Sequence, residues 1–503
     1  MRRERSDQGV EPGGPLLTRR ETLWHGMTGV AMVCSFDQVA RLAARPSGKT
    51  AAARRRGVSS PFDPFQVDLP KIPVLDPVSS TANADRYEIA IQEGLAEILP
   101  GYQTPIMGFG GTFPGPTIRV KRGRRAIVQQ TNELGETVTV HLHGGLVKEE
   151  SDGALHEYHI EPGGERTYRY PNAQPEATLW YHDHLHGMTG PHVNAGLAGF
   201  YIIESKRERK KDLPRGKYDV PLMIQDRSFL DDGSFNYSPS LLPGFHGDTI
   251  LVNGAIAPRM AVKRRLYRLR FLNASNARPY DLVLGNNRVM HQIASDGGLL
   301  PAPVKRKVIP LSPGERADVL VDFSKFRPGS QLILHNEATL PGEGSTAAVM
   351  RFDVEDGGGS EDFQIPKKLV GLEKLPPVAG PTREFALNFD DDGGIWTING
   401  EGFDPESPQA VSALGTSEKW HFVNEFDHHH PMHLHGCHFR IVSINGEPPH
   451  PADSGWKDTV CVPEEGEAVV RPYFKAHAGR FVFHCHTLEH GDTDMMALME
   501  ITG

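Results

Sequence analysis

Five residues near the end of the chain have the types and spacing of metal ligands. Cys485 lies between His484 and His486, His490 follows five residues after the cysteine, and Met495 ten residues after it. A thiolate, two imidazoles and a weak thioether form the ligand set of a blue electron-transfer copper site. Neighbouring side chains on a strand point to opposite faces, so both flanking histidines point away from the cysteine. They are therefore free to bind a second metal centre, joined to the first through one strand.

Four His-x-His pairs recur at fixed distances from two framework residues, an asparagine and a glutamate. The histidines follow the asparagine by nine and eleven residues, or the glutamate by seventeen and nineteen. The pairs are His141 and His143 after Asn132, His433 and His435 after Asn424, His182 and His184 after Glu165, and His484 and His486 after Glu467. Two distant segments that share the same spacing between framework residues and histidines indicate duplicated domains. Eight imidazoles exceed the needs of one ion, so we predict a cluster of about three ions held jointly by the first and last thirds.

The middle third has the same framework residues without the histidines. Counting the same distances from Asn273 and Glu315 reaches four leucines, Leu282, Leu284, Leu332 and Leu334. We therefore predict that this third keeps the strands, places core side chains at these four positions and binds no metal there.

Short strand-like runs separated by glycine and proline turns extend through all three thirds. The 53 glycines and 40 prolines fit β architectures that have many turns. A charged run at 204–211 and a stretch rich in glycine and proline at 355–381 have linker compositions. We predict an all-β chain of three β-sandwich domains, at 60–205, 215–355 and 378–503.

Four stretches of the sequence resemble the copper motifs of the multicopper oxidases. They are HLHGG (141–145), WYHDH (180–184), HPMHLHG (430–436) and HCHTLEHGDTDMM (484–496). The likeness covers nearly all of the chain after about residue 60. It is closest to bacterial spore-coat-type laccases and to bilirubin oxidases, through WKDTV (456–460), SDGGLL (295–300) and ILVNG (250–254). It implies that the three sandwiches are cupredoxin-like Greek-key domains, with copper in the first and third.

The resemblance also implies a place for each ligand among four copper ions. The type 1 copper would take His430, Cys485, His490 and axial Met495, with Met496 as the rival for the axial place. The type 2 copper would take His141 and His433, and the type 3 pair would take His143, His182, His184, His435, His484 and His486. His430 supplies the second imidazole of the cysteine site. We interpret its neighbours His428 and His429 as loop or surface residues.

The reaction expected from this likeness couples the two kinds of site. A donor would give single electrons to the type 1 copper at the edge of His490, and the cluster would reduce dioxygen to water. Because that reduction consumes protons, it needs a positioned acid. By similarity we expect Asp152, which could instead be a turn residue of a Ser-Asp-Gly loop. An acidic residue usually follows the second type 1 histidine in spore-coat relatives, but Gly491 stands here with Asp492 next, so their proton or dioxygen route is not assumed.

The donors expected are phenols, aromatic amines or bilirubin-like pigments, and three other functions are weighed against this one. The alternative within oxidases is a cuprous or manganous metallo-oxidase, but the 13 methionines form no cluster of the kind such enzymes carry. A copper-free structural protein of the same fold would have lost ligands, and none of the outer ligands is missing. A blue electron carrier would not need eight further histidines.

The rest of the sequence bears on location and partners. Arg19 and Arg20 precede an apolar run, so residues 1–57 resemble a twin-arginine export signal, with a chance arginine pair as the alternative. We expect an extracellular, cell-surface or periplasmic location, or a spore coat. The net charge of −9 argues against nucleic acid, no segment suits a membrane span, and we expect a monomer. Cys437 and Cys461 either pair or stay reduced, and Cys437 is either a further thiolate ligand or a packed thiol.

Overall fold

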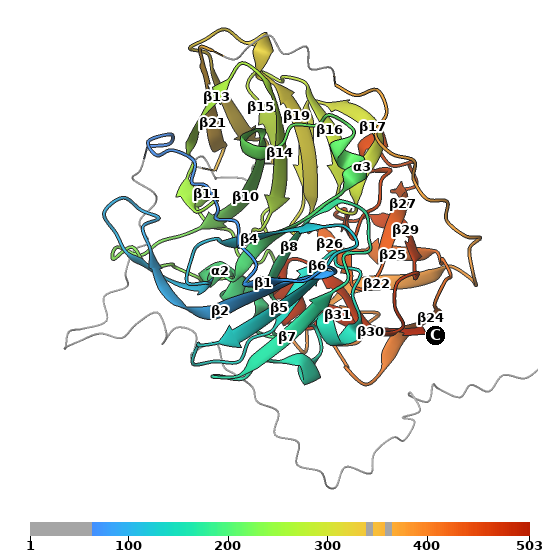
Figure 1. The fold of residues 1–503 in the computed structure, drawn as a ribbon. Helices are drawn as coiled ribbons and strands as arrows, with labels where there is room; N and C mark the ends of the chain where they lie inside the picture. The colour runs from blue at the N-terminus through green and yellow to red at the C-terminus, as the bar shows by residue number, and fades with distance from the viewer. Residues whose placement is uncertain (1–62, 339–345, 358–364) are drawn as a thin grey trace, which may run out of the picture. The chain divides into compact units, whose positions relative to one another are not determined.

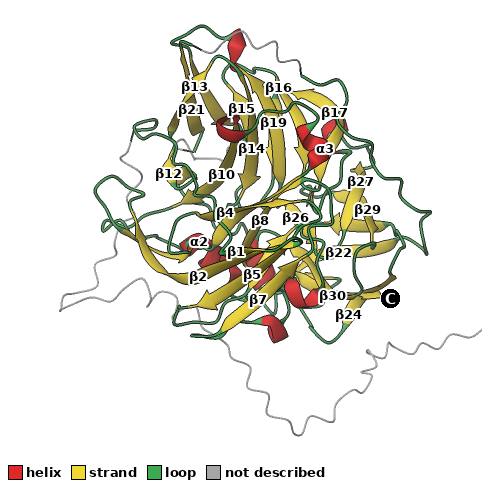
Figure 2. Ribbon diagram, in the orientation of Figure 1, coloured by secondary structure: helices red, strands yellow, loops and turns green. Residues whose placement is uncertain are grey.

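The computed structural model describes residues 63–338, 346–357 and 365–503, so the predicted export segment 1–57 lies outside the described residues. Strands make up most of the regular structure (Figure 2). The short helices are α2 (Thr189–Ala195), α3 (Lys206–Arg209) and α4 (Leu488–Asp492), with single 3₁₀ turns η1 (Glu149–Ser151), η2 (His156–Tyr158), η3 (Gly216–Tyr218), η4 (Phe323–Lys325) and η5 (Pro451–Asp453). None of the helices in these ranges is long and apolar enough to cross a membrane.

The first sandwich, blue to green in Figure 1, consists of two sheets. One contains β1 (Ser79–Ser80), β2 (Ala84–Ala96), β5 (Arg125–Asn132) and β7 (Glu165–Tyr170) in that order, with β3 (Thr104–Phe109) paired to β2. The other has the order β4 (Gly115–Lys121), β9 (Ala198–Glu204), β8 (Ala177–Asp183) and β6 (Val140–His143). Strand β5 shows why the sequence folds this way, because Ala126, Val128 and Asn132 alternate with more exposed side chains along it.

The middle sandwich also has two sheets. The larger has the order β12 (Ala255–Ile256), β11 (Thr249–Val252), β10 (Asp219–Arg227), β14 (Leu266–Asn273), β19 (Arg316–Asp322), β16 (Met290–Ser295) and β17 (Gly298–Arg306). The smaller has the order β13 (Arg259–Lys263), β21 (Ala348–Glu355), β20 (Gln331–Asn336), β15 (Tyr280–Leu284) and β18 (Val308–Leu311).

The last sandwich repeats this plan with two five-stranded sheets. One has the order β23 (Ile395–Ile398), β22 (Arg383–Asp390), β25 (Trp420–Asn424), β29 (Glu467–Tyr473) and β27 (His438–Ile444). The other has the order β24 (Pro408–Ala413), β31 (Met496–Thr502), β30 (Gly479–Cys485), β26 (His430–Leu434) and β28 (Thr459–Val462).

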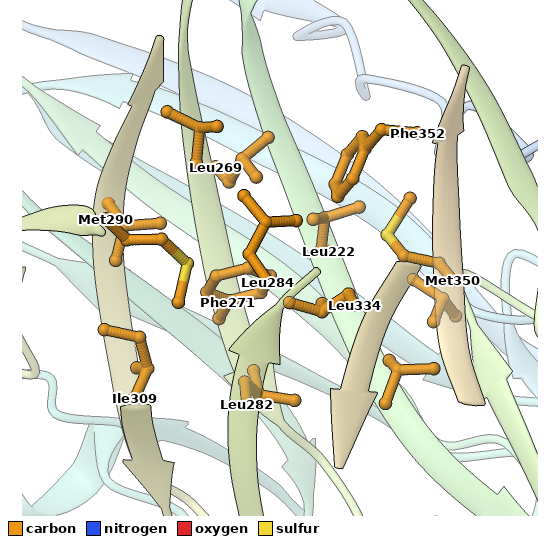
Figure 3. Packing of buried hydrophobic residues seen from close by; sticks show 14 of the residues in the cluster. Leu222, Leu269, Phe271, Leu282, Leu284, Met290, Ile309, Leu334, Met350 and Phe352 are labelled. Atoms are coloured by element: carbon orange, nitrogen blue, oxygen red, sulfur yellow. The ribbon is translucent and has the colours of Figure 1, made fainter. Parts of the chain in front are cut away.

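Each sandwich has its own hydrophobic core between its two sheets. In the middle sandwich Leu222, Leu269 and Phe271 of one sheet pack against Leu284 and Phe352 of the other (Figure 3). The first and last sandwiches have corresponding clusters. Burial of such side chains is the main favourable contribution to the stability of each unit.

The four counted leucines of the middle sandwich are core residues as predicted, but their equivalence to the histidines is wrong. The side-chain amide of Asn132 donates to the carbonyl of Glu136, four residues on, and Asn424 does the same to His428. Asn273 donates to the carbonyl of Arg278, five residues on, because its turn is one residue longer. A shift of one residue turns every side chain of a strand to the other face.

Strand pairing gives the true counterparts. His141 lies opposite His182, and His433 lies opposite His484. The corresponding pair in the middle sandwich is Val283 opposite His335. The middle sandwich therefore keeps one histidine of the pattern, and its leucines correspond to core residues such as Leu142.

The strands that carry the histidines are buried on both faces. β6, β8 and β26 are buried along their whole length, and β30 is buried from Phe481 to its end. On β6, Val140 and Leu142 face the core of the first sandwich, so His141 and His143 face away from it. The histidines are thus directed to a buried space outside their own sandwich cores.

Candidate metal centres

The first centre is formed by His430, Cys485 and His490 in the last sandwich. Cys485 Sγ lies 3.5 Å from Nδ1 of His430 and 3.5 Å from Nδ1 of His490, and these two nitrogens are 3.2 Å apart. A point equidistant from the three atoms lies about 2.0 Å from each, close to the length of a metal–imidazole bond. All three side chains are buried. The arrangement can hold one metal ion in a trigonal set of two nitrogens and one sulfur.

The two neighbouring methionines differ in where they pack. Met495 belongs to the same core cluster as Cys485, and its backbone nitrogen donates to the carbonyl of His490 at 2.9 Å. Met496 packs instead in a separate cluster with Val482 and Leu498. This difference favours Met495 over Met496 as the axial ligand.

The imidazole of His490 has no exposed edge that a donor could touch directly, and the entry of electrons at that edge stays a prediction. The residue is 1% exposed, and its Nε2 donates to the carbonyl of Leu242 at 2.6 Å. Trp396 lies beside the imidazole with ring centroids 4.4 Å apart, and its Nε1 donates to the carbonyl of Leu241 at 2.9 Å. A donor would meet Leu241 and Leu242, which are 37% and 41% exposed, before it met the imidazole.

The second centre brings together all eight histidines of the four His-x-His pairs. Nε2 of His141 lies 3.4 Å from Nε2 of His433. Nε2 of His484 lies 3.1 Å from Nε2 of His184 and 3.1 Å from Nε2 of His435. His143, His182 and His486 complete the group, with the rings of His143 and His486 4.9 Å apart and those of His182 and His486 5.5 Å apart. Three overlapping sets of nitrogens here are close enough to hold metal ions, each set within 4.8 Å.

Hydrogen bonds on the outer side of these rings select the nitrogen that faces the centre. Nδ1 donates to a backbone carbonyl in four of them: His141 to Asp152, His182 to Asp183, His433 to Asp458 and His484 to Cys485, at 2.7 to 2.9 Å. A neutral imidazole that donates through one nitrogen has a lone pair on the other, so Nε2 of each is left for a metal. His143 is reversed, because its Nε2 lies 3.0 Å from a carboxylate oxygen of Asp458.

The remaining nitrogens test whether the site fits metal ions. Nδ1 of His143, Nε2 of His182 and both ring nitrogens of His486 are buried without a hydrogen-bond partner among the described residues. Leaving buried polar atoms unpaired costs free energy, so a site with several of them is incomplete without a ligand. Copper is commonly bound by imidazole nitrogens, as the second centre offers. It is also bound by a thiolate together with two imidazoles, as the first centre offers.

Comparison with known proteins agrees with this donor set. The sequence profile of the multicopper oxidases matches residues 90–208 and 376–502. A laccase of Bacillus subtilis is 36% identical, over 88% of this chain and 99% of its own length.

The chain belongs to the multicopper oxidase family.

Other members agree with this assignment. A bilirubin oxidase of Albifimbria verrucaria is 32% identical over 88% of this chain and 82% of its own length. The solved structure of a laccase from Pediococcus acidilactici superimposes with a TM-score of 0.79, at 33% identity, and covers 88% of this chain and 96% of that one. The predicted all-β fold of three cupredoxin-like sandwiches is confirmed. The protein is accordingly an oxidoreductase of a copper-dependent family, and its histidine clusters can bind metal.

The histidines of this multicopper oxidase are held in the neutral form that binds metal. Burial lowers the pKa of His182 to about 3 and that of His484 to about 4. Burial and the neighbouring imidazoles likewise hold the pKa values of His141 and His435 well below the usual range. A metal does not have to displace protons from such rings at neutral pH.

Asp152 lies against the second centre, directly after η1. Its Oδ2 accepts a hydrogen bond from Nδ1 of His435 at 2.8 Å, and its Oδ1 lies 3.6 Å from Nδ1 of His141. The side chain is buried, and Oδ1 has no hydrogen-bond partner among the described residues. Burial, aided by Glu149, raises the pKa of this carboxyl well above its ordinary value. The position and the raised pKa suit a proton donor.

Gly491 and Asp492 lie beside two histidines of the second centre. They line a small cavity with His184, His484 and Cys485. Asp492 is half-buried and accepts from the backbone nitrogens of Thr189 and Gly190 at 3.0 and 2.7 Å. A carboxyl group is therefore present beside this cavity although the position after His490 is a glycine.

The other candidates lie outside the metal-ligand groups found among the described residues. Cys437 and Cys461 are free thiols and form no disulfide. Cys437 is buried in the core of the last sandwich, which agrees with a packed thiol. His428 and His429 lie in the turn before β26 and are half-buried rather than fully exposed.

Two charged groups beside the ligands were missed by sequence reasoning. Asp458 belongs to the WKDTV motif, and no spacing rule connects it with His143. Asp183 lies between His182 and His184, and its carboxylate accepts from Nδ1 of His192 at 2.9 Å. Nε2 of His192 lies 3.5 Å from the carboxylate of Glu136. Nothing in the sequence signals that this histidine is paired with two acids.

His192 gives a testable dependence of stability on pH. Burial disfavours its charged form, but Asp183 and Glu136 more than offset this and raise its pKa to about 10. A group with a raised pKa in the folded state stabilises that state fully below its unfolded pKa, about 6.5, and loses this contribution as pH rises through the folded value. We expect the urea midpoint of His192→Gln to lie below that of the original chain at pH 7 and to approach it at pH 10.

The control for this measurement is His156→Gln, because His156 has a side chain that is 59% exposed. Its urea midpoint should equal that of the original chain at both pH values. A His192→Gln difference that stays constant between pH 7 and pH 10 would show that His192 is not charged at pH 7.

Proposed function

We propose that the chain binds four copper ions and uses them to pass electrons from small aromatic donors to dioxygen, which is reduced to water. The donors proposed are phenols, aromatic amines or bilirubin-like pigments. In this proposal the type 1 ion is held by His430, Cys485, His490 and Met495. The type 2 ion is held by His141 and His433, and the type 3 pair by His143, His182, His184, His435, His484 and His486.

The observation that carries the proposal is the end of strand β30. Sγ of Cys485 faces the first centre, while the rings of His484 and His486 face the second. The two centres are thus joined by single peptide links, and Nδ1 of His484 donates to the carbonyl of Cys485 itself at 2.9 Å. Such continuity supports the passage of electrons from one centre to the other within the protein.

Bound copper would supply one-electron acceptance at the first centre and the binding and reduction of dioxygen at the second. The chain's own contribution is to hold the rings, exclude water and supply protons. The ligands are buried, and Asp152 is our candidate for the acid that delivers protons at the second centre. We further propose domain limits at 60–205, 215–355 and 378–503, and export of the chain through a twin-arginine signal at 1–57.

The decisive experiment loads the full chain with copper and measures copper content, visible spectrum and oxygen uptake with a simple phenol. We expect four copper ions per chain, an intense blue band, and one dioxygen consumed for every four donor molecules, without hydrogen peroxide. A blue protein with one copper ion and no oxygen uptake would contradict the proposal and indicate an electron carrier.

The same assay separates the proposed donors from the alternative, a metallo-oxidase acting on cuprous or manganous ions. If the chain acts on organic donors, its kcat/KM for the phenol should exceed its kcat/KM for the cuprous or the manganous ion. Oxidation of the ions alone would replace the first proposal by the second.

A further inference from the structure

The middle sandwich touches the second centre although it provides no histidine to it. The turn between β18 and β19 contains Gly314, which has a φ of +82°. A Cβ atom at this position would lie 3.0 Å from carbon atoms of both His143 and His486. Such a distance is shorter than ordinary van der Waals contact, so the backbone of this turn is packed against rings from the first and last sandwiches.

Arg316, two residues further on, joins all three sandwiches. Its guanidinium pairs with both oxygens of Asp458 in the last sandwich, at 2.7 and 2.5 Å. Its Nε donates to the carbonyl of Thr178 on β8 of the first sandwich at 3.0 Å, and its Nη1 to that of Gly314 at 2.9 Å. Arg316 and Asp458 are both 0% exposed at their side chains.

Asp458, the partner of Arg316, also contacts two histidines of the second centre. One carboxylate oxygen lies 3.0 Å from Nε2 of His143, and the backbone carbonyl of Asp458 accepts from Nδ1 of His433 at 2.8 Å. A carboxylate that pairs with a bidentate arginine has a fixed plane, because two parallel hydrogen bonds set both oxygens. The orientation of His143 is therefore set through Asp458 by a residue of the middle sandwich.

We propose that Arg316 is a positioning residue for the second centre, acting through Asp458 to keep Nδ1 of His143 and Nε2 of His433 directed at the metal ions. This inference rests on the proposed function, because it takes these two nitrogens as copper ligands. It also gives the middle sandwich a role in the oxidase beyond that of a spacer. Outer partners of metal-bound histidines commonly change metal affinity by about 10- to 100-fold when they are removed.

The test compares Arg316→Lys with Arg268→Lys. Lysine keeps the positive charge but lacks the planar fork that fixes a carboxylate. Arg268 is a matched control, because it is a buried arginine of the same sandwich whose carboxylate partners, Glu208 and Asp318, lie outside the histidine clusters. Copper would be removed by a graded series of chelator concentrations, while the blue band and the electron paramagnetic signal of the type 2 copper are recorded.

We expect Arg316→Lys to keep the blue band and to lose copper from the second centre at chelator concentrations about 10-fold lower than the original chain. Arg268→Lys should lose copper as the original chain does. Equal loss in Arg316→Lys and the original chain would overturn the inference, and so would parallel loss from both centres. If the original chain itself bound only the blue copper, the proposed function would fail instead, so the two failures are distinguishable.

A double variant covers the case in which Arg316→Lys does not fold. Arg316→Met with Asp458→Asn removes both charges together, so that this ion pair leaves no unpaired charge buried. We expect it to lose copper from the second centre as readily as Asp458→Asn alone, because in this inference Arg316 positions His143 and His433 through Asp458. If the double variant retained copper as well as the original chain, positioning through Asp458 would be contradicted. The same conclusion would follow if its loss of copper affinity, on a logarithmic scale, were twice that of Asp458→Asn.

Discussion

Replacing Cys485 by serine should abolish the blue band of the copper-loaded chain and lower kcat for a phenol by about 1,000-fold or more, which is about 4 kcal/mol of barrier. The thiolate is the soft ligand that a blue copper site requires, and a serine hydroxyl is a hard donor that does not replace it. Sγ of Cys485 also lies at the junction of the two centres. The measurement is steady-state oxygen uptake together with the visible spectrum of the same sample.

Cys437→Ser is the control for this substitution. Cys437 is also a buried thiol in the core cluster of the last sandwich, but it lies outside the metal-ligand groups found among the described residues. The control should keep the blue band and the kcat, with a loss of stability only. If the Cys485→Ser protein were still blue and active, Cys485 would not be a ligand of the type 1 copper.

Replacing Asp152 by asparagine should lower the rate of oxygen reduction by about 100- to 10,000-fold, the usual contribution of a general acid. Asparagine keeps the shape of the side chain and a hydrogen-bonding group near His435, but it carries no transferable proton. The reduction of the first centre by a phenol without oxygen should be unchanged. Stopped-flow recording of the blue band, first under nitrogen and then after mixing with oxygen, separates the two steps.

Asp152→Glu is the matched variant, because it restores the carboxyl group one methylene further from the backbone. It should recover part of the lost rate, whereas a purely structural role for Asp152 would leave both variants equally slow. An asparagine variant that reoxidises at the original rate would exclude Asp152 as the acid and direct attention to Asp492.

Cys485 and the paired histidines could be recognised from sequence as candidate ligands because their positions follow local rules. Alternation along a strand separates Cys485 from His484 and His486, and the repeated spacing from Asn132 and Asn424 finds the paired histidines. The structure brings these residues together as the spacing indicated. Neighbouring residues thus carry enough information when the element is a regular strand.

The partners of the ligands could not be predicted, since they come from distant parts of the chain. Arg316 reaches Asp458 across 142 residues of sequence, and Leu242 reaches His490 across 248. No periodicity marks such pairs. Counting also failed in the turn after Asn273, where one additional residue moved Leu282 and Leu284 to the core face. Hydrophobic residues alone do not reveal such a change in loop length.

The contact between His141 and His433 joins residues 292 positions apart. A ribosome must therefore finish most of the chain before the two halves of the second centre can meet. An unfinished chain that ends before β26 would offer four imidazoles without their counterparts, and it would hold the metal weakly. Tight binding of metal at the second centre therefore requires that the last sandwich has been synthesised and has docked. Metal retention is consequently a measure of whether the whole molecule has assembled.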